Sequence, residues 1–167
     1  MNLAATLEVL SDLVPYRVPA GEGRTYSVLG DRVSVKATAD ETGGAYALFE
    51  GQIQPGSGVP PHIERHEDEA LFVLEGTFVF LIAGETVEVG PGDFAFVPRG
   101  TPHAFTNVGR ETGRLLVLLS PGGIHERYFT ELGGPTGVPN APAGPADIER
   151  AIAISTKYGI DFLPPDA

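Results

Sequence analysis

The chain has 167 residues, with 22 acidic and 11 basic side chains and a formal net charge of −11 at pH 7. This length suits one domain with short terminal arms, and the acidic balance argues against nucleic acid or an anionic membrane as a partner, because both require clustered lysine and arginine. Cysteine is absent, which excludes disulfides, thiolate metal ligands and a cysteine nucleophile.

Neither a secretory signal nor a membrane-spanning segment is predicted. No basic segment followed by an apolar run stands at the N-terminus, and no apolar stretch approaches the roughly 20 residues that cross a bilayer. We therefore expect a cytoplasmic protein.

Residues 1–23 are expected to form a helical arm. Apolar residues recur at helical spacing from Leu3 to Val14, and Pro15 ends the pattern, which predicts a helix over residues 2–14. Such a helix packs either on the rest of the chain or on a second copy.

Residues 24–120 show the pattern of a β domain. Short runs rich in β-branched and aromatic residues alternate with turns rich in glycine, proline and aspartate, and no helical pattern intervenes. The expected strands cover residues 25–29, 32–38, 45–54, 70–74, 77–82, 86–89, 94–97, 103–107 and 114–120. Many short strands in this order predict an all-β sandwich or small barrel.

Residues 121–167 are expected to form a C-terminal helical extension. The pattern predicts a short helix over residues 125–132 and a second helix over residues 146–157. Gly159 then stops the second helix, and residues 162–165 are expected to be extended.

The most informative stretch is the run of mostly ionisable residues from His62 to Glu69, which stands between two apolar β patterns. Burying such groups is costly unless something binds them, and histidine with carboxylate is a donor set for divalent transition metals. In one continuous strand His62 and Glu64 would face one side and Glu69 the other. A turn at residues 65–68 removes this conflict, and His103 opens a further strand that can face the same interior. The sequence therefore predicts a metal centre.

Two motifs make the sequence resemble the cupin superfamily. The family's first motif is a glycine, a His-x-His pair, a glutamate and a second glycine, and it reads here Gly56, His62, Glu64, Glu69 and Gly76. The second motif reads, without a departure, Gly92, Pro98, Gly100, His103 and Asn107. The match covers residues 56–107, and the flanking strands extend it to about residues 24–120. It implies a cupin barrel, a double-stranded β-helix of the jelly-roll kind, with a short N-terminal helix and a C-terminal helical arm.

The resemblance also implies a ligand set for one divalent transition metal, which is Fe, Mn, Ni, Co, Cu or Zn. Carried over, the ligands are His62, Glu69 and His103, with Glu64 where the family usually has its second histidine. If Glu64 binds, two carboxylates make the ion a weaker Lewis acid. If it does not, the other three form the two-histidine, one-carboxylate triad of non-haem iron oxygenases. The remaining alternatives are that His66 replaces the missing imidazole, or that the cluster is a metal-free polar patch.

Three further polar residues are expected neither to bind the metal nor to take part in catalysis. His66 stands among charged turn residues and is expected to be solvated. His125 lies outside both motifs and is expected at the surface. Asn107 is expected to be structural.

The residues around the motifs are similar to those of small single-domain cupins of the quercetinase type. The similar segments are residues 60–62, 67–69, 72–76 and 96–103. This resemblance implies a metal-dependent dioxygenase that opens a flavonol or similar aromatic enol with O2, in which Glu69 is the catalytic base as well as a ligand and Glu64 shares or takes that role. The expected walls for a planar aromatic ligand, which also suit plain barrel core, are Phe49, Leu71, Val73 and Phe105.

Two other functions stay open at this point. The first is non-oxidative metal chemistry, as in cyclase and isomerase cupins, which the extra negative charge of Glu64 favours. The second is a non-enzymatic cupin that binds a small molecule. We expect a small aromatic partner, with O2 in the dioxygenase case, neither nucleic acid nor membrane, and a homodimer by analogy with the family.

Overall fold

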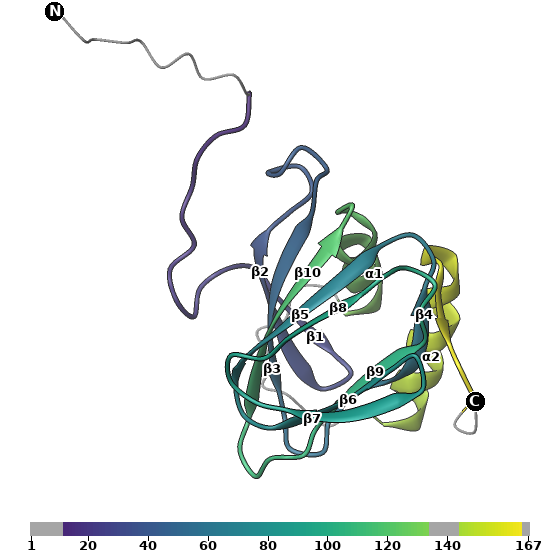
Figure 1. The fold of residues 1–167 in the computed structure, drawn as a ribbon. Coiled ribbons are helices and arrows are strands. Elements are labelled where there is room, and N and C mark those ends of the chain that lie inside the picture. Colours follow the sequence, from purple (N-terminus) through teal and green to yellow (C-terminus); the bar gives the residue numbers. More distant parts are fainter. Residues whose placement is uncertain (1–11, 134–143, 165–167) are drawn as a thin grey trace, which may run out of the picture.

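The computed structural model describes residues 12–133 and 144–164, which form two antiparallel β-sheets and two α-helices (Figure 1). The first sheet contains, in order of hydrogen-bonded neighbours, β1 (Thr25–Val28), β2 (Asp31–Ala37), β3 (Ala47–Ile53), β10 (Gly113–Ser120), β5 (Asp68–Glu75) and β8 (Phe94–Val97). The second sheet contains β11 (Ile160–Phe162), β4 (Gly58–Glu64), β9 (His103–Asn107), β6 (Phe78–Ile82) and β7 (Glu85–Val89). The two sheets enclose the interior, so successive side chains of a strand point alternately inward and outward.

The expected all-β fold with C-terminal helices is confirmed. Each predicted strand has a counterpart whose ends differ by at most two residues. The order of the strands in the sheets is what the sequence pattern did not predict: β3 and β5 both pair with β10 rather than with each other, and β4 pairs with β9. The pairing of β4 with β9 places His62 and His103 side by side in the second sheet, while Glu69 lies on β5 of the first sheet.

The strand β11 extends the second sheet at the edge of β4. It was expected only as part of an extended tail after Gly159. Gly159 adopts a positive φ of 71°, which ends the preceding 3₁₀ turn (Thr156–Tyr158) and directs the chain back along β4. Phe162 then lies opposite His62 in the ladder. A partner so distant in sequence leaves no local signal, so only the tertiary fold reveals this strand.

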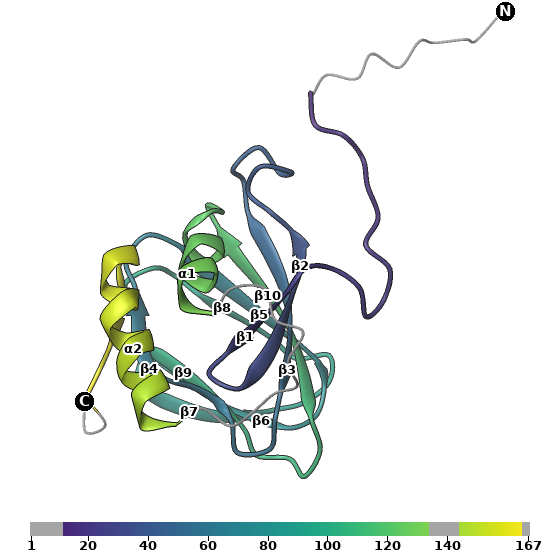
Figure 2. The same cartoon turned by 180° about the vertical axis from the view of Figure 1, so that it is seen from behind.

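Two helices follow the barrel, α1 (Ile124–Leu132) and α2 (Pro145–Ser155). Figures 1 and 2 show α2 along the side of the barrel formed by β4, while α1 packs beside β1. Within the described ranges, neither helix has the length and apolar character that crossing a membrane requires. Of the helix expected over residues 2–14, residues 2–11 lie outside the described part of the chain, and residues 12–14 are not helical.

The helix α1 is held by an aromatic core between it and the first sheet. Phe129 packs edge-on against Phe49, with 5.3 Å between ring centroids, and also contacts Tyr26 at 6.1 Å. Its neighbours in the helix, Tyr128 and Leu132, are buried as well. Because α1 presents this apolar face inward, its first turn reaches the interior of the barrel.

Candidate metal centre

Two facing strands, β4 and β9, supply three buried side chains that converge. His62 stands opposite His103 in the antiparallel ladder, and the centroids of their rings are 4.1 Å apart. Glu64, two residues after His62, points to the same face. The three side chains are only 1–4% exposed, and one ligand atom from each lies within 4.8 Å of the others. With this geometry the three side chains could hold one metal ion.

The turn after β4 brings a fourth residue to the site. Residues 65–67 leave the strand, and β5 then begins at Asp68, so Glu69 faces inward as the parity argument requires. Its Oε2 atom lies 2.9 Å from Nε2 of His103. Glu69 adjoins the three-residue group through His103 but is not a member of it.

Backbone carbonyls set the tautomer of both histidines. Nδ1 of His62 lies 2.9 Å from the carbonyl of Pro60, and Nδ1 of His103 lies 2.9 Å from the carbonyl of Thr101. A carbonyl only accepts, so each Nδ1 carries the proton and donates it. In the neutral form of each ring, Nε2 then presents a lone pair to the interior, which is the state that metal-binding imidazoles adopt.

Several buried polar atoms at this site have no hydrogen-bond partner among the described residues. They are both carboxylate oxygens of Glu64, Oε2 of Glu69 and Nε2 of His103. The 2.9 Å approach of His103 to Glu69 is not aligned as a hydrogen bond. Each unpaired buried polar group costs about 1–3 kcal/mol. A divalent transition metal would satisfy all of them, and imidazole with carboxylate is a donor set that such ions accept, so these residues fit a metal.

A third buried histidine, His125, corrects the expectation that this residue lies at the surface. It is 7% exposed, and its Nε2 lies 3.1 Å from Oε1 of Glu64. Its Nδ1 donates a hydrogen bond to Glu67, which also accepts from the backbone N–H of Ile124. Glu67 is only 2% exposed, although it belongs to the charged turn in which His66 was expected to be solvated.

A helical pattern was the signal that could have found His125. It precedes Tyr128, Phe129 and Leu132 by three, four and seven residues, so it shares their apolar face. His66, by contrast, is exposed as expected, and it does not belong to the group of ligand atoms.

Neighbouring charges govern ionisation at the site. Burial raises the pKa of Glu64, but the adjacent His125 and then His62 outweigh burial and hold the pKa of this carboxyl well below its usual range. Burial likewise opposes the charged form of His103 and His125, yet Glu69 raises the pKa of His103, and Glu64 with Glu67 raises the pKa of His125 well above the ordinary value. Glu64 is therefore an ionised carboxylate, which is the form that binds a cation.

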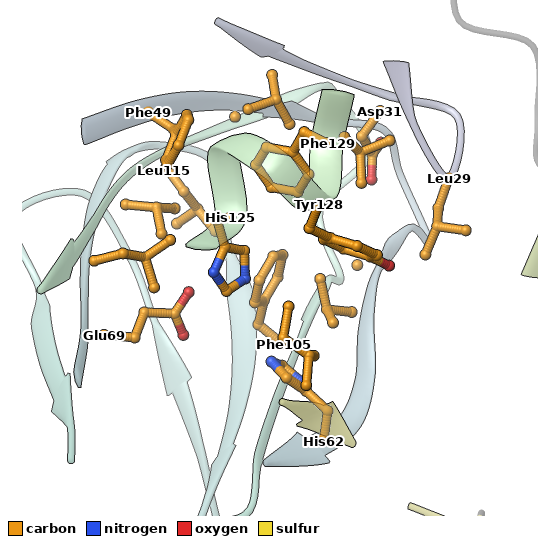
Figure 3. A pocket seen from close by; sticks show the side chains of 18 of the residues that line it. Leu29, Asp31, Phe49, His62, Glu69, Phe105, Leu115, His125, Tyr128 and Phe129 are labelled. Atoms are coloured by element: carbon orange, nitrogen blue, oxygen red, sulfur yellow. The ribbon is translucent and has the colours of Figure 1, made fainter. Parts of the chain in front are cut away.

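The site forms one wall of a mostly apolar cavity of about 100 Å³. Figure 3 shows His62, Glu69 and His125 directed into it from β4, β5 and α1, with Phe49 and Phe105 among the surrounding side chains. Leu71 and Val73, which were expected in this wall, are not among the residues that line the cavity, but they are buried in a core cluster that includes Phe105. They point inward, as their alternation predicts, and are at most 1% exposed.

An ion pair holds the turn between the two acidic residues of the site. Arg99 donates to both carboxylate oxygens of Asp68, at 3.0 and 2.9 Å, and its backbone N–H donates to the same carboxylate. These hydrogen bonds lower the pKa of Asp68 to about 2.

We expect Arg99→Ala to return the pKa of Asp68 towards about 3.9, with Arg99→Lys intermediate because lysine lacks the two-pronged geometry. A pKa depressed in the folded state stabilises the fold above pH 4 and loses that contribution as the pH falls through 2. Titration of the Asp68 carboxyl by NMR measures the shift directly. An unchanged pKa in Arg99→Ala would contradict this assignment.

Comparison with known proteins agrees with the architecture. The sequence model of the cupin domain family matches residues 49–119. The chain is 28% identical over 135 residues to a quercetin 2,3-dioxygenase of Bacillus subtilis (strain 168), covering 80% of this chain and 39% of that protein. It is 30% identical over 112 residues to polyketide synthase CurC of Streptomyces cyaneus, covering 67% of each. The chain thus spans well under half of the Bacillus protein.

A solved structure supports the same fold. The polyketide cyclase RemF of Streptomyces resistomycificus superposes with a TM-score of 0.56 at 26% identity, covering 64% of this chain and 80% of that one. Two facing antiparallel sheets with imidazoles and carboxylates buried between them define a small β-barrel protein with an internal His/Glu site. The chain belongs to the cupin family.

Proposed function

We propose that this protein is a metal-dependent dioxygenase of the quercetinase type, acting on a flavonol or a similar planar aromatic enol inside the barrel. The observation that carries the proposal is the set of buried, unpaired polar atoms on Glu64, Glu69 and His103, because both glutamates also line an aromatic-lined cavity. Sites of this kind, apolar with a few convergent polar groups, are the usual locations of small-molecule chemistry. The relative named as a dioxygenase aligns with 80% of the chain.

The ligands in this proposal are His62, Glu64 and His103, with Glu69 beside them. When bound, the metal supplies Lewis acidity for a chelating enol and, if it is redox-active, a means of activating O2. Because Glu64 already contributes a negative charge to the ion, Glu69 is available as the base. Its Oε2 faces the cavity next to His103 and takes the proton of a substrate hydroxyl.

The rest of the cavity provides orientation and excludes water. Phe49, Phe105 and Phe129 line it and give a planar ring faces to pack against. Removal of water strengthens every electrostatic contact at the ligands. The metal would then meet its substrate in a single orientation.

A second candidate, a non-oxidative cyclase or isomerase, is favoured by the glutamate at position 64. Two carboxylates neutralise a divalent ion and suit acid–base chemistry on an enol better than electron transfer. The relatives CurC and RemF, named as a polyketide synthase protein and a polyketide cyclase, support this alternative.

One experiment separates these functions. The protein is purified without chelators, its metal content is measured element by element, and O2 uptake is recorded with a panel of flavonols. We expect one transition metal per chain and O2 consumption that depends on the flavonol. Metal with flavonol turnover but without O2 uptake would select the cyclase or isomerase. Absence of stoichiometric metal would overturn both and leave a binding protein.

A further inference from the structure

A chain of three buried polar side chains, Glu64, His125 and Glu67, joins the site to α1. Oε1 of Glu64 lies 3.1 Å from Nε2 of His125, and Nδ1 of His125 lies 2.5 Å from Oε2 of Glu67. Glu67 is fixed in turn by the backbone N–H of Ile124, at 3.2 Å. The cupin motifs contain neither His125 nor Glu67, and the proposed chemistry gives them no role.

We propose that His125, held by Glu67, is a positioning residue that orients Glu64 as a metal ligand. The inference rests on the metal site proposed above. Position 64 has a glutamate in place of the family's histidine, and α1 supplies an imidazole, that of His125, next to this carboxylate. The glutamate and His125 thus work as a pair.

Comparison with His62 and His103 shows why Glu64 needs a residue that orients it. His62 and His103 are each anchored by a backbone carbonyl at Nδ1, but neither oxygen of Glu64 has an aligned hydrogen bond. A glutamate has more rotatable bonds than a histidine, so it loses more conformational entropy when it is held in one geometry. Contact with a rigidly mounted imidazole limits that freedom, in the way that outer hydrogen bonds orient metal ligands generally.

His125 is mounted rigidly because it is packed as well as hydrogen-bonded. Its ring contacts Phe129 edge-on at 5.5 Å and Tyr128 at 6.1 Å. Glu67 lies in the turn between β4 and β5, the strands that carry Glu64 and Glu69. The pair therefore links α1 to both carboxylates of the site.

The test is a double-mutant cycle on cobalt binding. His125→Gln is made in the wild type and in Glu64→His, and the Kd for Co²⁺ is measured by competition with a chelator, together with the visible spectrum of the cobalt protein. We expect His125→Gln to weaken binding about 10–100-fold in the wild type and to change the cobalt spectrum. In Glu64→His, where the ligand no longer needs the partner, we expect little change in either.

Controls separate positioning from a purely structural role. His66→Gln makes the same exchange at an exposed histidine of the neighbouring turn and should leave the Kd unchanged. If His125→Gln fails to fold, Glu67→Gln, which keeps a hydrogen-bonding side chain, should weaken cobalt binding in the same direction. Equal losses in the two backgrounds, or none, would overturn the inference while leaving the dioxygenase assay unaffected. Failure of the wild type to bind cobalt would overturn both.

Discussion

Purified His62→Ala and His103→Ala are each expected to lack stoichiometric metal, whereas His66→Ala retains it. The two buried histidines face each other across β4 and β9, and each bonds a backbone carbonyl through Nδ1, which leaves Nε2 as the atom available to a metal. Loss of an outer hydrogen-bond partner typically costs about 10–100-fold in metal affinity, and loss of a ligand atom removes a metal–ligand bond itself, so we expect a larger cost. His66 is exposed and outside the group, so its imidazole has no ion to bind.

Element-resolved metal analysis after dialysis measures this result, and circular dichroism verifies that each variant is folded. The three substitutions remove the same side chain, so a general effect of losing an imidazole would appear in all of them. Equal loss of metal in His66→Ala would show that the ligand set is wrong. Full retention in His103→Ala would show that the ion, if present, is bound elsewhere.

Phe129→Ala is expected to lower the free energy of unfolding of the metal-free protein by about 3–5 kcal/mol. Phe129 is 9% exposed and packs against Phe49, Tyr26 and His125. Its removal leaves a cavity between α1 and the first sheet that the surrounding rings fill only in part. Because the same helix carries His125, we also expect weaker metal binding.

Urea unfolding of the metal-free protein measures the first effect, and the chelator competition measures the second. Phe94→Ala is the matched control, since Phe94 lies on β8 with 64% of its surface exposed. We expect that substitution to change the free energy of unfolding by less than about 0.5 kcal/mol. A similar loss in both variants would mean that the aromatic core does not anchor α1.

Local patterns in the sequence were sufficient for most of the strands and for the residues of the two motifs. Alternation and turn residues predict strands directly, because side-chain direction in a strand has a period of two. The parity of His62 and Glu69 required a turn between them, and the chain turns at residues 65–67. Asn107 has the structural role that was expected, since its side-chain amide donates to the carbonyls of Ile53 and Glu111.

Local sequence patterns could not predict contacts between segments that are distant in the sequence. His125 approaches Glu67 across 58 positions of sequence, and its burial depends on where α1 packs. Leu71 and Val73 face inward as predicted, but the side chains that pack beside them follow from the pairing of β5 with β8 and β10. The homodimer and the division of the chain at residues 23 and 120 stay predictions.

The sequence by itself, through its two motifs, indicated the cupin barrel and predicted an internal centre with His62, Glu69 and His103 as ligands and the role of Glu64 left open, because periodicity and motif spacing act over a few residues at a time. Only the tertiary structure decided that Glu64 is backed by His125 and Glu67, and that β11 covers the edge of β4. Such contacts arise from the packing of whole elements. No local sequence pattern predicts which helix face will meet which strand edge.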